Sequence, residues 1–226
     1  MIGVERFDLH LHSVYSVDSG MRVQALLDQA SSAGLRGLAL TDHNSIEGHA
    51  RLFELAPRYP RLILVPGVEV STAEGHLLVY GVQEAPPRGP RLAEAIDWAT
   101  RRGYAAVLAH PFRLFHGAGR RHSETARVSA LEAVNGHTGE LANAKAELLA
   151  AQRSLGTTGG SDAHAPRDVG RAFTEFADSV ERADDVVDLL RRGRCHASGR
   201  SLRGAERIWV PLRHAGRRVA RGFRPV

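Results

Sequence analysis

Hydrophobic and polar residues alternate along this chain in a pattern that predicts strands and helices in turn. Short apolar runs, many of them β-branched, are typical of buried strands, and most are followed by a stretch with the apolar spacing of an amphipathic helix. Strands are expected at residues 7–12, 37–41, 62–70, 76–81, 105–110, 129–135 and 157–162. Helices are expected at residues 23–33, 46–55, 92–102, 140–155 and 180–191. This alternation predicts a mainly parallel α/β sheet or barrel with the helices outside.

Turn-forming residues separate these elements and suggest where the domain ends. Gly34 and Gly103 follow expected helices, and the proline-rich residues 86–90 form a loop between the two halves. A chain of 226 residues can bury one substantial core. From Gly193 onward the sequence is rich in arginine and glycine. We therefore expect one barrel domain at residues 1–196 and an arginine-rich C-terminal extension at residues 197–226.

Composition restricts the protein class and the chemistry of any metal site. No apolar run approaches the roughly 20 residues that a membrane-spanning helix requires, and the N-terminus leads into a strand rather than a signal peptide. We expect a cytoplasmic protein with no membrane contact. Cys195 is the only cysteine, so metal ligands would have to be histidine, aspartate or glutamate. The formal net charge of +5 favours anionic partners without identifying one.

Residues of the kinds that bind metals stand at the ends of most expected strands. Parallel barrels place their catalytic residues at this edge, and residues two apart on a strand, such as His10 and His12, point the same way. A single histidine at a strand end is more often a hydrogen-bonding residue than a ligand, but coincidence across several strands favours shared cations. The residues concerned are His10, His12, Asp42, His43, Glu69, His76, His110, Asp162 and His164.

Five short motifs that contain these residues resemble those of the polymerase and histidinol phosphatase (PHP) superfamily. They are D-L-H-L-H-S at 8–13, T-D-H-N at 41–44, G-V-E-V-S at 67–71, A-H-P at 109–111 and G-S-D-A-H at 160–164. The resemblance covers residues 4–196. It implies a distorted (β/α)7 barrel of the PHP type that holds two or three divalent ions, Zn, Mn or Fe rather than Mg, and that acts as a phosphoesterase.

The resemblance also implies which residues hold which ion. The first ion would be held by His10, His12, Glu69 and Asp162. Glu69 would bridge to a second ion held by His76 and His110. The third would be held by Asp18, His43 and His164. Many relatives carry a histidine where this chain has Asp18, so occupancy of the third site is left open.

The expected reaction is hydrolysis of a phosphate ester by a metal-bridged hydroxide, with a nucleotide or other small phosphorylated metabolite as substrate. The third ion, or Asp18 and His164 in its absence, is expected to bind phosphate oxygens or move a proton to the leaving group, and these two residues are the catalytic candidates. Arg113 is the preferred phosphate clamp and Arg171 the second, because a guanidinium matches phosphate geometry. Substrate contacts are also expected from Asn135 and His137.

Three alternatives remain open at this point. The same chemistry cleaves non-phosphate bonds, and a PHP module can bind metal without turnover. The substrate could also be a nucleic-acid end, with the C-terminal arginines as a contact, namely Arg213, Arg217, Arg218, Arg221 and Arg224. Surface or hydrogen-bonding roles away from the strand ends are expected for His49, His116, His122, His196 and His214.

Overall fold

The computed structural model describes residues 5–203 and 206, and in this part of the chain nine strands form one sheet. The strands are β1 (Glu5–Leu11), β2 (Gly37–Leu40), β3 (Ile63–Thr72), β4 (Gly75–Tyr80), β5 (Ala105–Leu108), β6 (Ala130–Asn135), β7 (Gly156–Gly160), β8 (Ala172–Phe176) and β9 (His196–Gly199). The helices are α1 (Val23–Ser32), α2 (Gly48–Leu55), α3 (Leu92–Arg101), α4 (Gly119–Thr125), α5 (Glu140–Gln152) and α6 (Ala183–Arg191), with short 3-10 helices η1 (Ala56–Arg58) and η2 (Pro166–Asp168).

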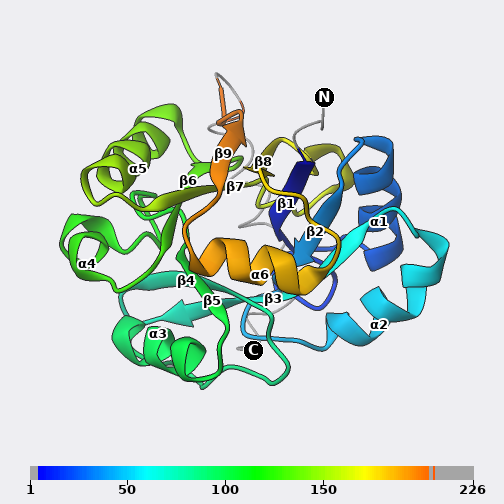
Figure 1. The fold of residues 1–226 in the computed structure, drawn as a ribbon, viewed down its shortest axis with the longest axis horizontal. Helices are drawn as coiled ribbons and strands as arrows, with labels where there is room; N and C mark the ends of the chain where they lie inside the picture. Colours follow the sequence, from blue (N-terminus) through cyan, green and yellow to red (C-terminus); the bar gives the residue numbers. More distant parts are fainter. Residues whose placement is uncertain (1–4, 204–205, 207–226) are drawn as a thin grey trace.

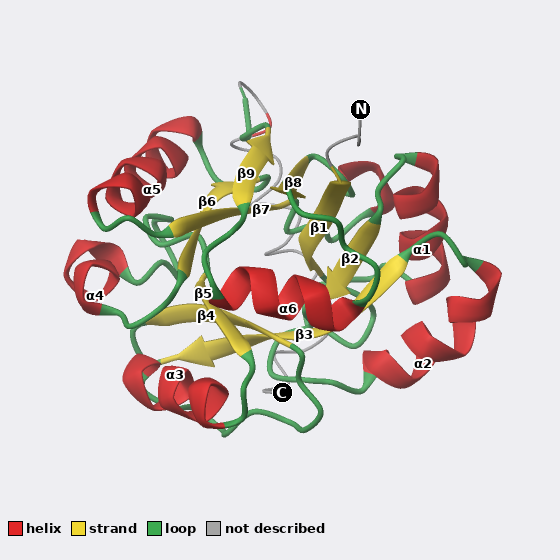
Figure 2. Ribbon diagram, viewed as in Figure 1, coloured by secondary structure: helices red, strands yellow, loops and turns green. Residues whose placement is uncertain are grey.

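The sheet curls into a nearly closed barrel. Its order is β7-β6-β5-β4-β3-β2-β1-β8-β9, and β7 at one end of this order contacts β1, β8 and β9. Just beyond β7, Ala163 forms a parallel bridge with Leu11 at the end of β1. The helices surround the strands in Figures 1 and 2, which confirms the predicted barrel with helices outside.

The strand directions differ in part from the mainly parallel sheet that the sequence predicts. The pairs β1–β2, β2–β3, β5–β6 and β6–β7 are parallel, whereas β3–β4, β4–β5, β1–β8 and β8–β9 are antiparallel. The connection from Thr72 to Gly75 explains one antiparallel pair, because a two-residue turn is too short for a parallel crossover. The barrel is therefore of mixed direction.

Three elements are not predicted by the sequence pattern, namely α4, β8 and β9. The sequence of α4, GRRHSET, lacks a regular apolar face, and β9 is a short strand, HASG, with no fully buried residue. Strand β9 extends to Gly199, three residues past the expected boundary of the barrel domain. The rest of the expected extension lies mostly outside the described residues, as do His214 and all five C-terminal arginines named above.

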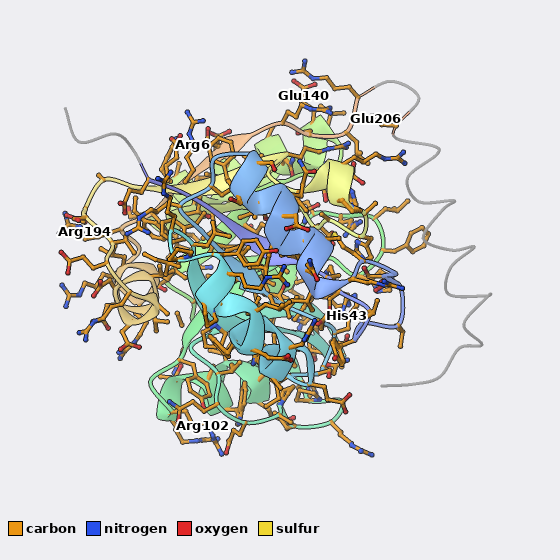
Figure 3. All side chains as sticks on the ribbon, turned by 90° about the vertical axis from the view of Figure 1, so that its right-hand side faces the viewer. Arg6, His43, Arg102, Glu140, Arg194 and Glu206 are labelled. Carbon is orange, nitrogen blue, oxygen red and sulfur yellow. The ribbon has the colours of Figure 1, made fainter. Side chains whose placement is uncertain are left out.

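One end of the barrel is closed by α6. Val186 and Leu190 of this helix share an apolar cluster with Phe7 of β1, Val65 of β3 and Val107 of β5. Helix α6 crosses the face of the molecule that points toward the viewer in Figure 1. In the view of Figure 3, Arg194 beyond α6 and His43 lie toward opposite sides of the molecule. The strand ends that carry the polar residues thus lie at the end of the barrel opposite α6.

The end of β1 directs the first two histidines toward the site. The register with β2 shifts between Asp8 and Leu11. After the shift, Leu11 packs in the cluster formed with α1 and α2, while His10 and His12 lie next to Glu69. Residues two apart on a strand point to the same face, so His10 and His12 both reach Glu69 while Leu11 between them points into the apolar cluster.

No helix in the described part of the chain is long and apolar enough to cross a membrane.

Candidate metal centre

The carboxylate of Glu69, on β3, lies at the middle of a buried group of histidines. The Glu69 side chain is 1% exposed. Five imidazole nitrogens from five different residues face its two oxygens. Oε1 lies 2.7 Å from His76 Nδ1 and 3.0 Å from His110 Nε2, and Oε2 lies 3.1 Å from His10 Nε2, 3.2 Å from His12 Nε2 and 3.3 Å from His43 Nδ1.

Two further carboxylates complete the group. Asp162 follows β7, and its Oδ1 lies 3.2 Å from His12 Nε2 and 3.6 Å from His164 Nδ1. Asp18 follows β1, and its Oδ2 lies 3.4 Å from His43 Nε2 and 3.3 Å from His164 Nε2. The structure thus brings all nine predicted ligands together in overlapping groups of three whose ligand atoms lie within 4.8 Å of one another.

The spacing of these atoms fits shared cations better than hydrogen bonds alone. His12 Nε2 and His43 Nδ1 lie 3.2 and 3.3 Å from Glu69 Oε2 without satisfying hydrogen-bond geometry. Two ligands of a tetrahedral ion with bonds of about 2.0–2.1 Å are separated by about 3.3 Å, which is close to the separation found here. A buried carboxylate is costly unless positive charge or donors surround it. The donor set therefore fits divalent metal ions.

The electrostatics of the carboxylates support this conclusion. Burial alone would raise the pKa of Glu69, but the imidazoles of His43 and His10 hold that pKa well below its usual value. Burial would also raise the pKa of Asp162, and here His10 and Arg113 hold the pKa well below the usual value. Both carboxylates are therefore anionic at neutral pH, as a metal ligand would have to be.

The imidazoles respond to the same surroundings in two ways. Burial lowers the pKa of His76 and of His110 despite the nearby Glu69, which favours the neutral form that binds metals. Burial also opposes protonation of His12, but Asp162 and Glu69 outweigh it and raise the pKa of His12 to about 10. The space between these two carboxylates thus favours positive charge.

Two of the ligand candidates adopt strained backbone conformations. His110 follows β5 with a φ of 25°, and Asp162 follows β7 with a φ of 54°. Residues other than glycine rarely occupy this region, and such strain is concentrated at functional sites. The amide of Asp162 donates a 2.8 Å hydrogen bond to the His10 carbonyl, which fixes the turn that carries the aspartate.

Arg113, the preferred phosphate clamp, lies beside the cluster. Its Nη1 donates to Asp162 Oδ2 at 2.6 Å, and the side chain is 25% exposed. The loop that carries it is closed by hydrogen bonds from Arg113 N to His110 O and from Gly119 N to Pro111 O. Its guanidinium is thus both anchored to a ligand candidate and partly accessible.

Arg171 and His137 lie in a second layer. Arg171 Nη2 donates to Asp168 at 2.7 Å and to Glu206 at 3.2 Å, and its Nη1 donates to the Gly136 carbonyl at 3.4 Å. The ring of His137 stacks on that of His164 with 5.7 Å between centroids, and its Nε2 lies 3.6 Å from Asp168. The structure therefore links His137 to the cluster through His164, whereas these bonds direct Arg171 toward neighbouring acids and the backbone.

The side chain of Asn135 is engaged on both of its polar atoms. Its Nδ2 donates to Glu132 at 3.1 Å and to Asp162 at 3.3 Å. Its Oδ1 accepts hydrogen bonds from His137 N and from the Thr138 hydroxyl. A contact with substrate would therefore require Asn135 to give up one of these bonds.

Several residues near the cluster are not anticipated by the sequence. The ring of His116 stacks on His76 at 4.9 Å, which corrects the expectation that His116 lies away from the site. Glu132 bonds His10 and the His110 amide, and a charged residue inside the apolar run of β6 was a signal for it. Asp42, by contrast, is one of the metal-binding residue types that the sequence places at strand ends, but it belongs to none of the possible ligand groups among the described residues. It accepts hydrogen bonds from the amide and the hydroxyl of Ser13 and so holds the loop after β1 in place.

The rim beside the cluster exposes apolar side chains. Val14 and Tyr15 in the loop after β1 are 40% and 36% exposed, and Leu114 and Phe115 in the loop after β5 are 88% and 71% exposed. These loops follow two strands that position ligand candidates. Loops at this edge of a barrel commonly contact the substrate.

Fold and site together define a class of protein, a nearly closed α/β barrel with a buried imidazole and carboxylate centre at the strand ends. A family model described as the PHP domain matches residues 8–154, and one described as PHP-associated matches residues 140–195. The chain therefore belongs to the PHP domain family, which confirms the resemblance seen in its motifs.

Individual relatives agree with this assignment. PsfC from Pseudomonas syringae superposes with a TM-score of 0.70 at 23% identity, covering 97% of this chain and 100% of PsfC. A Bifidobacterium adolescentis protein, provisionally assigned as a metal-dependent phosphoesterase, gives a TM-score of 0.63 at 17% identity and covers 83% and 96% of the two chains. These likenesses confirm the predicted distorted barrel.

A third relative is similar over a shorter region. The phosphoribosyl 1,2-cyclic phosphate 1,2-diphosphodiesterase of Eggerthella lenta is 35% identical over 86 residues, which cover 35% of this chain and 32% of that enzyme. Family, fold and donor set together support a metal-dependent hydrolase.

Proposed function

We propose that this protein is a metal-dependent phosphoesterase that hydrolyses phosphate esters of small metabolites, including nucleotides. The observation that carries the proposal is the arrangement around Glu69, where five imidazole nitrogens face one buried carboxylate at distances of 2.7–3.3 Å. A carboxylate with imidazole nitrogens facing each of its two oxygens is suited to bridging two cations.

Three sets of residues are proposed to hold the ions. The first set is His10, His12, Glu69 and Asp162, the second is Glu69, His76 and His110, and the third is Asp18, His43 and His164. The nearness of Asp18 Oδ2 to both His43 and His164 supports the third set in spite of the aspartate. Imidazole-rich sites suit Zn, Mn or Fe better than Mg, which prefers oxygen ligands.

When bound, divalent ions would supply an activated water and offset the charge of the phosphoryl group. Arg113 has guanidinium donors beyond the one that faces Asp162, and we assign these to a phosphate oxygen of the substrate. If the third site holds no ion, Asp18 and His164, whose Oδ2 and Nε2 atoms lie 3.3 Å apart, are assigned to hold the proton that the leaving group receives.

Two further observations favour a phosphate ester. The cyclic-phosphate diphosphodiesterase of E. lenta is 35% identical to this chain where the two align. An arginine also lies beside the centre, which suits an anionic substrate better than a neutral amide or lactone. A nucleic-acid end has the same phosphate chemistry and remains within this substrate class.

The test is metal analysis of the purified protein followed by a phosphate-release screen over nucleotides, bisphosphates, sugar phosphates and oligonucleotides. The expected result is two or three equivalents of metal and release of phosphate or a phosphorylated product. Glu69→Gln is expected to lose most of the metal and activity, whereas Glu47→Gln, at an exposed position, is expected to keep both. Hydrolysis confined to a parallel amide and lactone panel would overturn the phosphoesterase proposal.

A further inference from the structure

Glu132 is a buried carboxylate beneath the cluster. It lies on β6, and its side chain is 1% exposed. Its Oε1 lies 2.8 Å from His10 Nδ1, and its Oε2 accepts hydrogen bonds from the His110 amide at 2.9 Å and from Asn135 Nδ2 at 3.1 Å. Both oxygens are thus committed to groups that belong to the site or adjoin it.

These contacts connect several strands that carry ligand candidates. His10 lies on β1 and His110 follows β5, so Glu132 joins both to β6. Asn135, at the end of β6, extends the connection because its Nδ2 also donates to Asp162 at 3.3 Å. One carboxylate therefore fixes the positions of His10, from the first proposed ion site, and His110, from the second, relative to each other.

The contact with His10 also determines which ring nitrogen can act as a ligand. A carboxylate oxygen accepts hydrogen bonds, so His10 Nδ1 is the donor at 2.8 Å. When an ion is bound on the other side of the ring, the lone pair of the neutral imidazole would lie on Nε2, which is 3.1 Å from Glu69 Oε2 and 3.7 Å from Asp162 Oδ1. An imidazole that donates its other N–H to a carboxylate is a more basic and better oriented ligand.

The neighbouring strand leaves room for this arrangement. A Cβ placed on Gly160 of β7 would lie 2.9 Å from Glu132 Oε1 and would also collide with His10 Cβ. Glycine is thus required at position 160 for the carboxylate and the imidazole to approach each other.

We propose that Glu132 is a positioning residue that selects the Nδ1–H tautomer of His10 and so sets the metal affinity of the site. The inference rests on the proposed metal centre but is independent of the reaction catalysed. Loss of such a partner typically weakens metal binding by about 10- to 100-fold.

Glu132→Gln tests this because glutamine has one acceptor and one donor group at its end. If the glutamine oxygen faces His10, its NH2 group faces the backbone N–H of His110, so two donors meet and that hydrogen bond is lost. If it is reversed, the NH2 group faces His10 Nδ1, and the ring must carry its proton on Nε2. The expected result is a Kd for Zn²⁺ or Mn²⁺ that rises by about 10- to 100-fold in calorimetric titration.

The matched control is Glu5→Gln. Glu5 is a carboxylate at the other end of β1 that also accepts a backbone N–H, from Val180 at 3.0 Å, and an arginine donor, from Arg36 at 3.2 Å. Its variant is expected to keep the metal affinity of the unaltered protein. Equal Kd values for all three proteins would overturn the inference.

A second measurement does not depend on how the variant folds. In the unaltered Zn²⁺-loaded protein, long-range proton–nitrogen NMR correlations report the His10 tautomer, assigned by the signal lost in His10→Gln. Protonation on Nδ1 supports the proposal, and protonation on Nε2 overturns it. If the unaltered protein binds no metal, the proposed centre itself fails, whatever the behaviour of Glu132.

Discussion

Arg113 contacts a buried ligand candidate, Asp162, and is also partly exposed to solvent at the edge of the site. Its 2.6 Å bond to Asp162 holds the guanidinium in place, and its 25% exposed side chain leaves donors accessible. Such an arrangement suits an arginine that orients substrate without being a metal ligand.

Replacing Arg113 is therefore expected to affect substrate binding. Arg113→Ala should raise the Michaelis constant for the phosphate ester by about 10- to 100-fold, since a hydrogen bond to a charged group contributes about 1.5–3 kcal/mol. Steady-state kinetics on the metal-loaded protein measures this. Arg120→Ala is the control because Arg120 is exposed and pairs with Glu124 in α4. Unchanged kinetics of Arg113→Ala would contradict the assignment.

The single cysteine offers a test of burial that is independent of the metal centre. Cys195 packs against the apolar cluster beneath α6, and burial raises the pKa of its thiol from 9.0 to about 12. Because the thiolate is the reactive form, alkylation of this partly buried thiol by iodoacetamide at pH 8 should be much slower in the folded protein than in urea. Mass spectrometry over time measures the two rates. Similar rates would show that Cys195 is accessible.

Among the elements, the long strands and helices could be predicted from the sequence, because their apolar residues repeat with the period of the structure. Helix 92–102 and strand 76–81, for example, are observed as Leu92–Arg101 and Gly75–Tyr80. Short elements such as α4 and β9 could not be predicted, because their residues have little apolar periodicity and depend on packing against distant segments.

The same distinction holds for the site. Its nine ligand candidates stand mostly in recognisable motifs at strand ends, so their convergence could be predicted. The roles of their supporting residues could not, because a charge inside the apolar run of β6 marks Glu132 as unusual without naming its partners, and His116 reaches the cluster only through a ring contact across the fold. The engagement of Asn135 by four groups was equally invisible in the sequence.

Close packing between strands β1, β2 and β3 leads to a prediction about Gly37. A Cβ at Gly37 would collide with the Ile63 carbonyl oxygen and the Phe7 ring, and the carbonyl cannot move without disturbing the parallel pairing of Gly37 with Ile63. Gly37→Ala should therefore lower the free energy of unfolding by about 3 kcal/mol.

Gly34 provides the comparison. Its φ is +68°, but no atom lies within 4 Å of the place that a Cβ would take, so Gly34→Ala should cost only about 1 kcal/mol through backbone strain. Urea denaturation of both variants measures the difference. Equal denaturation midpoints for the two variants would contradict the prediction, because they would show that β2 and β3 accommodate a methyl group at position 37.

For the molecule as a whole, metal binding should contribute to stability, because Glu69 and Asp162 come from strands that are far apart in the barrel order. An ion present at 100 times its Kd stabilises the folded state by about 2.7 kcal/mol. For a chain of this size that corresponds to about 5–10 °C in Tm. Calorimetry with added Mn²⁺ and with EDTA measures the shift.

Glu69→Gln gives the reference for this experiment. Its Tm should depend much less on added metal, because the proposed bridging charge is gone. A Tm of the unaltered protein that is the same with metal and with chelator would contradict the proposed centre.

The left-handed backbone at His110 and Asp162 bears on how this protein balances folding against function. Glycine would adopt the backbone conformation of either position without strain, but it has no side chain that could bind a cation. His110→Gly would relieve the backbone strain after β5 but would remove a proposed ligand, so the gain in stability is expected to come with weaker metal binding. Stability alone would favour glycine at both positions, so the strained side chains support the proposed metal centre.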